Sequence, residues 1–580
     1  MDGSQFFFAR DGRTNPLSEL KASIDAFGRD DLSVGTLGQH PQCAFPERYR
    51  FLKQELQLKT ADVDCPDFLE WKASLKADSL TLVFSAAFPN SPASMFGHTL
   101  LQLNQKNVLA KNSSEKHPLL NYGINSSAMM PLDENPMRYV VFGLLGGYDG
   151  YFSIAPYYLK VNEYNNSESR DLWEYELNLT SSQIEHMINH LWELYATSTF
   201  DYYFLDDNCS YQILSLLEVA NPAWDLTRRF NVYVLPADTI KAIQDYPGAI
   251  TRVDFRPSLQ KRLIAQVESL NPSERADYKG VIAGEKSPQE VPGNTTLDAL
   301  ITFYEYRQYN KSKGLPETEK KTLREILIQR SKVENPKEPT PFEYSKNSRP
   351  DLGHHSTSAG LQFGFRNDRG KKIELKSRFG LHDLLNHDLG YEPYTQVEST
   401  GGSIDFLLEE KKIKLNSLTL IEITSLYPFN FVDPKPSWTI GSKLDNFKDL
   451  QCSYCYGLIL EGGAGLSSEI IKEKALVYFL AIAHAEAGKE IPKIVRTGPG
   501  VNLAAILSPL NHYKLILSAK TYYDLVGSLK KRMFGRFEVN QSFALNRSFD
   551  LRWVSTFIPS FFRVTHTPFY ELGLNLNYYF

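Results

Sequence analysis

The sequence predicts an α+β domain with helical flanking segments, followed by an all-β C-terminal barrel. Three observations lead to this prediction: strand-like and helical stretches are mixed in the first half of the chain, a proline-rich charged stretch follows them, and short segments of alternating apolar and polar residues fill the remainder. At about 150 residues per domain, the 580 residues leave room for three or four units. We expect segments at 1–77, 78–255, 256–334, 335–355 and 356–580.

The first segment is predicted to be a small helical region. Apolar residues recur at helical spacing after Asn15, namely Leu17, Leu20, Ile24 and Phe27. No basic stretch followed by a long apolar run opens the chain, so no signal peptide is visible in it. No apolar run approaches the roughly 18 residues of a membrane-spanning helix, so we expect no helix to cross a membrane.

The second segment predicts a sheet with helices beside it. Residues 80–88 and 98–104 have the composition of strands. Thr180 and Gln183 can form a capping box for a helix with regularly spaced apolar residues, and a second helical pattern follows Cys209 directly. Helical patterns return in the third segment and end at the charged, proline-rich linker.

The last segment has the pattern of a β-barrel. About twelve stretches alternate apolar and polar side chains, an even number of the kind that closes into a membrane barrel. The terminal strand ends on Phe580, which resembles the terminal signal of bacterial outer-membrane barrels. A soluble sandwich or barrel has the same alternation and stays the alternative. If a membrane surrounds the barrel, its outward band should include Phe363, Phe365, Leu551, Trp553, Leu574 and Leu576.

The charge balance excludes one class of partner. Lys and Arg number 63 against 68 Asp and Glu, which gives a formal net charge of -5 and no general basic field. Nucleic acid is therefore not an expected partner. With 42% hydrophobic and 23% charged residues, most of the chain should fold.

The five cysteines suggest an exported protein. Cys43 with Cys65 and Cys452 with Cys455 are two plausible local pairs, which leaves Cys209 as a free thiol. The alternative is five reduced cysteines in a cytosolic chain. A redox role for Cys452 and Cys455 is not favoured, because no strand leads from them into a thioredoxin-type helix.

Cys209 is the candidate nucleophile. It follows Asp206, Asp207 and Asn208, residues that favour caps and turns, so its sulfur should lie where a helix begins and where the helix dipole stabilises a thiolate. An inert buried thiol is the alternative.

His98 is the candidate base, because the small and turn-forming residues before it lead directly into a strand that would carry its imidazole on rigid backbone. Asn125 would face His98 if the next strand pairs as its parity suggests, which gives a Cys-His-Asn arrangement, with Asn121 as the fallback. His186 and His190 are spaced for metal binding, but the Glu of a metalloprotease helix is absent, so we expect a solvated face and no metal.

Three runs carry a family resemblance: SAAFPNSPASMFGHTLLQL at 85–103, LLGGYDGYFSIAPYYLKVNEYNNSESRDLWEYELNL at 144–179 and FDYYFLDDNCSYQILSLLEVANP at 200–222. Together they resemble the extracytoplasmic catalytic domain of the Lnb family of lipoprotein N-acyltransferases, over about residues 78–255. The resemblance implies that His98 and Cys209 are the catalytic pair. The runs QFFFARDGRTNPLSELKA and CAFPERYRFL are similar to the segment that precedes this domain in Gram-negative members, which implies that a signal sequence was removed.

The Lnb family is similar in turn to permuted papain-like enzymes, the NlpC/P60 and lecithin:retinol acyltransferase-like proteins, in which His precedes the Cys. Here 209 − 98 = 111 residues separate them in that order. The resemblance implies a nucleophile that opens a helix packed on a small antiparallel sheet. Gram-positive Lnb proteins are anchored by transmembrane helices, whereas this chain is expected to use its barrel.

Further residues of these runs are candidates for substrate binding. Backbone N–H groups around Cys209 and Ser210 can stabilise a tetrahedral oxyanion. The other candidates for contacts with headgroup, oxyanion or substrate are Ser94, Tyr148, Tyr151, Tyr157, Lys160, Tyr164, Arg170 and Asn208. A structural network under a loop is the alternative for each.

The expected function is a cysteine acyltransferase in the periplasm, tethered to the outer membrane. It would move an acyl chain from a membrane glycerolipid ester, through a Cys209 thioester, to an amine, by resemblance the N-terminal Cys of a lipoprotein. We expect a monomer and no cofactor. The alternative is a cysteine hydrolase of the same superfamily, a peptidoglycan amidase, an endopeptidase or a lipase. A third hypothesis is a catalytically dead scaffold with a barrel that acts as a channel or assembly platform.

Overall fold

The computed structural model describes residues 3–86, 96–105, 120–131, 134–135, 138, 142–143, 145–230, 233–310, 314–334, 348–450, 454–491, 494–527 and 533–580. The chain forms two compact units. One contains Met1–Ala86 and Gly97–Phe342, and the other contains Glu343–Phe580.

The N-terminal region is helical, as predicted. Its helices are α1 (Pro16–Phe27), α2 (Pro41–Ala44), α3 (Pro46–Leu56) and α4 (Pro66–Leu75). Each begins with a proline, whose fixed φ and missing N–H suit the first helical turn. The predicted disulfide between Cys43 and Cys65 is present, with a Cα–Cα distance of 5.3 Å.

A seven-stranded antiparallel sheet forms the centre of the first unit, in the order β6-β4-β3-β2-β1-β5-β7. Its central strands β1 and β2 are apolar on both faces, because helices cover both sides. The strands are β1 (Ala77–Ser85), β2 (His98–Gln105), β3 (Tyr122–Ala128), β4 (Tyr148–Pro156), β5 (Leu172–Leu177), β6 (Phe200–Tyr202) and β7 (Ile250–Arg256).

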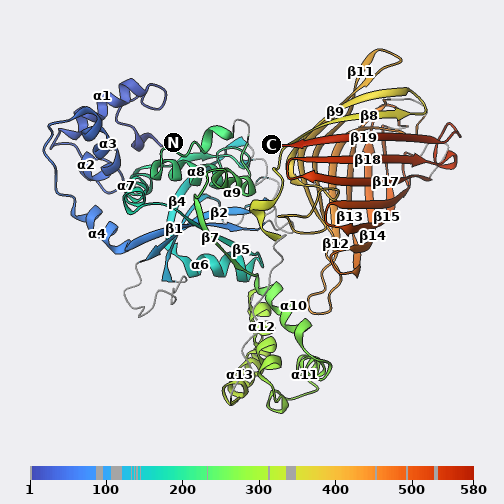
Figure 1. Ribbon diagram of the computed structural model, residues 1–580, viewed down its shortest axis with the longest axis horizontal. Helices are drawn as coiled ribbons and strands as arrows, with labels where there is room; N and C mark the ends of the chain where they lie inside the picture. The colour runs from blue at the N-terminus through green and yellow to red at the C-terminus, as the bar shows by residue number, and fades with distance from the viewer. Residues whose placement is uncertain are drawn as a thin grey trace. The chain divides into compact units, whose positions relative to one another are not determined.

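Two groups of helices cover this sheet (Figure 1). On one face lie α7 (Ser181–Thr197), α8 (Cys209–Ala220) and α9 (Pro236–Gln244). The predicted capping box of α7 is formed by Thr180 and Gln183. On the other face lie α6 (Tyr157–Val161) and the π-helical segment η3 (Asn162–Ser167), which pack against Val83 and Leu100. The fold is therefore α+β, as predicted.

Four further helices complete the first unit. They are α10 (Leu259–Ser269), α11 (Pro272–Ala283), α12 (Asn294–Asn310) and α13 (Glu317–Ser331). Residues 335–347 of the expected linker lie outside the described residues. No helix in the described part of the chain is long and apolar enough to span a membrane.

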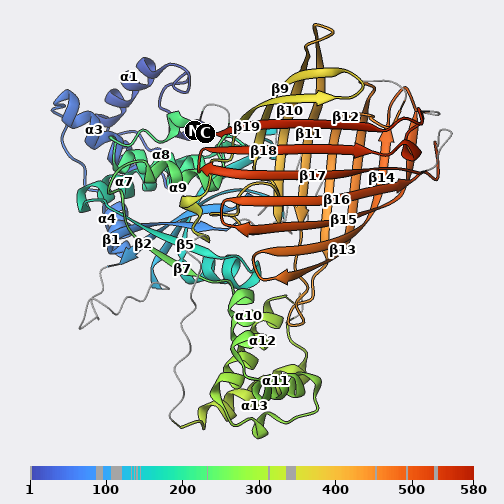
Figure 2. The same cartoon turned by 45° about the vertical axis from the view of Figure 1, so that its right-hand side comes forward.

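The second unit is a closed antiparallel barrel of twelve strands (Figure 2). It closes where the first strand, β8, pairs with the last strand, β19, so no sheet edge is left open. The strands are β8 (Ser358–Arg366), β9 (Gly370–His382), β10 (Thr395–Leu407), β11 (Lys412–Ser425), β12 (Ser437–Asn446), β13 (Tyr456–Ile471), β14 (Ala475–Ala487), β15 (Val495–Leu510), β16 (Tyr513–Tyr523), β17 (Met533–Asn546), β18 (Phe549–Ile558) and β19 (Phe569–Tyr579).

The outside of the barrel is apolar. The side chains of the predicted outward band are exposed, and their exposed fractions range from 37% for Leu551 to 59% for Phe363. The intervening residues Gln362, Glu374 and Asn575 point inward and are buried. An apolar exterior around a polar interior is the pattern of a membrane barrel and the reverse of a soluble one, so the soluble alternative is wrong.

Candidate active site

Cys209 is the first residue of α8, at the position predicted from its capping residues. Asn208 caps this helix, because its Oδ1 accepts hydrogen bonds from the backbone N–H groups of Ser210 at 2.9 Å and Tyr211 at 3.3 Å. The Asn208 amide also donates to the carbonyls of Phe204 and Val234. These four bonds fix the loop that carries Cys209 to the end of the helix.

The thiol of Cys209 is buried, yet its surroundings favour the thiolate. Burial raises the pKa of this thiol, but the charge of His98 and hydrogen bonds with His98, with the backbone of Thr99 and with the Ser210 hydroxyl outweigh it and bring the pKa to about 6. An ordinary thiol with a pKa of 9.0 is almost fully protonated at neutral pH. Cys209 therefore has the protonation state of a nucleophile.

His98 is held in one orientation by Asn125. The distance from His98 Nε2 to Asn125 Oδ1 is 2.6 Å, and the Asn125 amide donates to the Ser127 hydroxyl at 3.2 Å. The amide thus presents its oxygen to His98, so we assign the proton to Nε2 and leave Nδ1 for Cys209.

The pKa of His98 shows the same pairing with Cys209. Burial lowers it, but the Cys209 thiolate and the hydrogen bonds with Cys209 and Asn125 raise it above the usual value. Each of these two side chains therefore favours the charged form of the other.

Sheet register explains why these residues meet. Leu101 of β2 pairs with Ile124 of β3, so the residues of opposite parity, His98 and Asn125, share the other face. The fallback, Asn121, lies elsewhere, because its side chain bonds to Asn104 and to the backbone of Gln105.

Tyr164 and Arg170 complete the surroundings of His98. The ring of Tyr164 packs against the His98 ring with centroids 5.3 Å apart. Arg170 is buried, lies over the Tyr164 ring, and donates to the carbonyls of Ser85 at 2.9 Å and Ala86 at 2.8 Å. Ser85 is the residue of β1 that pairs with His98. Arg170 therefore donates its hydrogen bonds to groups of the protein itself.

The backbone around the thiol differs from the expected oxyanion site. The N–H of Ser210 is used by the cap residue Asn208, and the N–H of Cys209 donates to the Tyr202 hydroxyl at 3.3 Å. An oxyanion at Cys209 would have to compete with Tyr202 for that donor. Tyr202 and Thr99, whose hydroxyl lies 3.0 Å from that of Ser210, were not expected at the site from sequence.

Other candidate residues have partners of their own. Tyr157 is fully buried and donates to Glu174 at 2.8 Å, Tyr148 donates to Glu134 at 2.9 Å, and Lys160 pairs with Glu163 at 2.8 Å. Ser94 lies outside the described residues.

The second predicted cysteine pair and the two histidines with metal-binding spacing lie outside this site. Cys455 is disulfide-bonded, whereas Cys452 lies outside the described residues. His186 lies 3.3 Å from Glu47, and His190 lies 2.7 Å from Glu193. Within the described ranges, no group of three or more His, Cys, Asp or Glu residues is placed to hold a metal ion.

Comparisons with known proteins agree with this architecture. Residues 67–246 match the Lnb N-terminal periplasmic domain, whereas 1–55 and 347–579 match two domains of unknown function, DUF7843 and DUF7840. A search of curated proteins finds no match.

The solved structures similar to this chain include a porin and an outer membrane channel. The NanC porin is 6% identical, with a TM-score of 0.25, over 38% of this chain and 98% of its own. LpxR from Salmonella typhimurium is 12% identical, with a TM-score of 0.25, over 38% and 100%. The COG4313 outer membrane channel from Pseudomonas putida F1 is 11% identical, with a TM-score of 0.25, over 41% and 100%.

The fold and the family match define a membrane-associated periplasmic domain joined to an outer-membrane barrel. The chain matches the Lnb-type description, with an Lnb N-terminal periplasmic domain at residues 67–246 and a C-terminal barrel. It is an outer-membrane protein, and this domain lies in the periplasm.

Proposed function

We propose that the protein is a thiol acyltransferase that moves an acyl chain from a membrane glycerolipid to the N-terminal amine of a lipoprotein. The observation that supports it most is the pairing of a low-pKa Cys209 with a His98 that Asn125 orients. The lipid and lipoprotein substrates come from the resemblance to Lnb enzymes, and the outer-membrane barrel would keep the thiol near lipid.

The first half-reaction forms a thioester. The Cys209 thiolate attacks the ester carbonyl of the glycerolipid and forms a tetrahedral oxyanion. Collapse of this intermediate breaks the bond to the glycerol oxygen, which takes the proton from His98 Nδ1. The products are an acylated Cys209 and a lysolipid alcohol, and His98 is left neutral.

The second half-reaction forms an amide. The N-terminal amine of the acceptor attacks the thioester carbonyl while His98 Nδ1 takes one of its protons. Collapse expels the Cys209 thiolate and restores the ion pair. Asn125 holds the imidazole throughout, and Arg170 acts as a positioning residue through Tyr164 and Ser85.

The test separates transfer from hydrolysis. Purified full-length protein in lipid is incubated with a diacylglyceryl lipopeptide that has a free N-terminal amine, and the products are read by mass spectrometry. We expect an acyl chain on the amine and an equal amount of lysolipid, both lost in Cys209→Ala.

Two other outcomes would contradict the proposal. Release of free fatty acid with an unmodified amine would make the protein a lipase. Cleavage of peptidoglycan fragments without any lipid reaction would make it an amidase or endopeptidase.

A further inference from the structure

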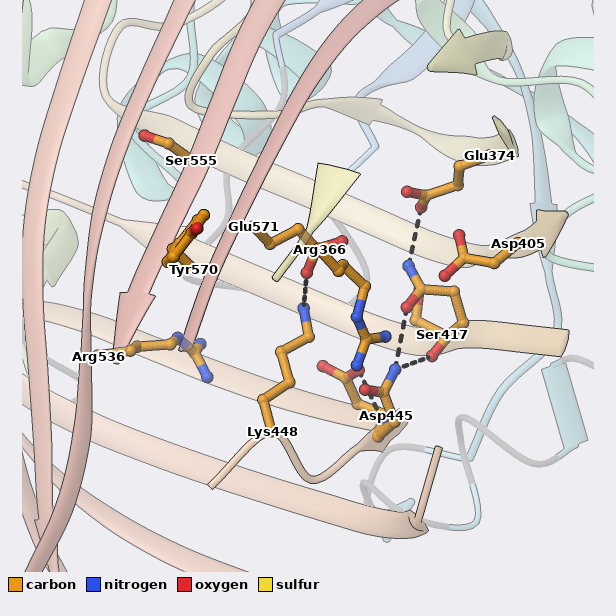
Figure 3. Close-up of polar contacts among 12 residues, drawn as sticks. Arg366, Glu374, Asp405, Ser417, Asp445, Lys448, Arg536, Ser555, Tyr570 and Glu571 are labelled. Carbon is orange, nitrogen blue, oxygen red and sulfur yellow. Dashed lines mark hydrogen bonds and ion pairs between the residues drawn. The ribbon is translucent and has the colours of Figure 1, made fainter. Parts of the chain in front are cut away.

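The barrel interior contains a dense set of buried ion pairs and hydrogen bonds, part of which is drawn in Figure 3. Lys372 of β9 lies at its centre and pairs with Glu374 at 3.0 Å, Asp405 at 3.1 Å and Glu571 at 2.5 Å. The side chains of Lys372 and Asp405 have no exposed surface at all. In a water-filled pore such groups would be hydrated, so this part of the lumen is filled by protein.

A segment between β12 and β13 contributes to this filling. We call its described residues, Phe447–Leu450 with Tyr454 and Cys455, the strap. The N–H of Phe447 donates to the carbonyl of Cys455 at 2.8 Å, which joins the two ends of the strap. Three polar side chains then extend from it to the barrel wall.

These three side chains reach three separate strands. The Tyr454 hydroxyl donates to Asp405 of β10 at 2.7 Å. Lys448 pairs with Glu571 of β19 at 2.9 Å, a contact that Figure 3 shows as a dashed line. Asp449 accepts two hydrogen bonds, at 2.7 and 3.2 Å, from the guanidinium of Arg496 on β15.

The positions of these strands require the strap to cross the lumen. Around the closed barrel, β10 and β15 are five strands apart, β15 and β19 are four apart, and β19 and β10 are three apart through β8 and β9. The three anchors are therefore spread around the whole circumference. One short segment that contacts all of them must pass through the interior.

Apolar packing and a second loop hold the strap in place. Phe447, Leu450 and Cys455 are buried in one cluster with Ile459 and Ile491. Between β18 and β19, Arg563 donates to the Lys448 carbonyl at 3.0 Å and the Val564 N–H donates to the Asp449 carbonyl at 3.1 Å.

Deeper in the barrel, the β14–β16 wall is apolar on its inner face. A buried cluster there includes Leu480, Ile482, Ile506 and Ile516. Leu384 and Leu385 of the β9–β10 loop pack against this cluster. The inner wall of a diffusion pore is polar, so a packed apolar cluster has no place in one.

We propose that the barrel is a sealed membrane anchor and that the strap closes its lumen. This inference concerns the second unit alone and does not depend on the acyltransferase chemistry. A strap held by a tyrosine, a lysine and an aspartate also defines which contacts have to break for the lumen to open.

The test is the conductance of full-length protein in planar lipid bilayers. We expect no discrete steps above the bare bilayer for the unaltered protein. The triple variant Lys448→Gln, Asp449→Asn, Tyr454→Phe removes the three anchors. The wall residues still have partners in it, because Arg496 remains paired with Glu486 and Glu571 remains paired with Lys372. We expect this variant to show discrete steps.

A matched control alters charges at the same rim without touching the strap. Lys489 and Glu490 in the β14–β15 loop are exposed and pair only loosely at 3.9 Å, so Lys489→Gln with Glu490→Gln should stay silent. A folded barrel migrates faster on a gel before heating than after it. This difference verifies that the barrel of each variant is folded. If the triple variant does not fold, Lys448→Gln with Tyr454→Phe replaces it, which releases the strap from β19 and β10.

Two results would overturn the proposal. Discrete steps in the unaltered protein would show that the barrel is an open channel. Silence of a folded strap variant would show that the strap is not what seals the lumen.

Discussion

Replacing His98 by Ala provides the most direct test of the ion pair at Cys209. Without the imidazolium, burial still disfavours the thiolate, so the pKa of Cys209 should return to 9.0 or above from about 6. At pH 7 the thiolate fraction then falls from about 90% to about 1%. A thiolate of lower pKa is also less nucleophilic, by roughly 20-fold for three pKa units at a Brønsted slope of 0.4–0.5.

These two effects oppose each other, and their balance depends on pH. At pH 7 the unaltered protein should therefore react with iodoacetamide only about 4-fold faster than His98→Ala. At pH 5 the thiolate fractions are about 9% and 0.01%, so the advantage rises to roughly 40-fold. The thiolate exists above the pKa of Cys209 and is lost as pH falls through about 6, so the unaltered protein should reach its plateau by about pH 7.

The assay is the rate of Cys209 alkylation between pH 4.5 and 9.5, read by intact mass. Ser182→Ala is a control, because Ser182 contacts another histidine, His186, at 3.3 Å on the exposed side of α7. Parallel pH curves for the unaltered protein and His98→Ala, or an inflection near 9 in both, would refute the pairing.

Four other changes have expected outcomes. Asn125→Ala should slow acyl transfer by about 10- to 100-fold with little change in folding, as measured by single-turnover rates and thermal unfolding, because the imidazole loses its fixed orientation. Arg170→Gln should move the alkaline limit of the pH–rate profile upward, because the Arg170 charge lowers the pKa of His98; Arg256→Gln, which removes a pair with Glu174 in the same sheet, should not move it. Cys65→Ala opens a loop of 22 residues and should lower the free energy of unfolding of the first unit by about 3 kcal/mol, measured by urea titration. Trp553→Arg, on the outward face, should destabilise the barrel by about 2–4 kcal/mol in a refolding assay in lipid, and an effect near zero would contradict the membrane assignment.

Several parts of the site could be predicted because they follow local rules. Asn125 was found from the two-residue period of a strand, which places it on the same face as His98. Cys209 was placed at a helix end because Asn208 is a capping residue. The barrel was visible because its alternation repeats over twelve strands.

Other parts depend on contacts that no local pattern encodes. Tyr164 reaches His98 from a π-helical segment, and the turn after it holds Ser169 at φ +55°, a conformation that non-glycine residues rarely adopt. The hydrogen bonds of Arg170 and Tyr157 are of this kind, because their partners, the Ser85 carbonyl and Glu174, lie on other elements, 85 and 17 positions away in the sequence. The strap is of the same kind, since its anchors lie on three separate strands.

The topology of the barrel places the strap at the rim opposite the two ends of the barrel chain. An even number of strands brings the start of β8 and the end of β19 to the same rim, so the chain enters and leaves the barrel on one side. The turn from β12 to β13 follows the fifth strand and therefore lies at the opposite rim. A barrel sealed in the proposed way would anchor the Lnb-type domain in the outer membrane without opening a path through it.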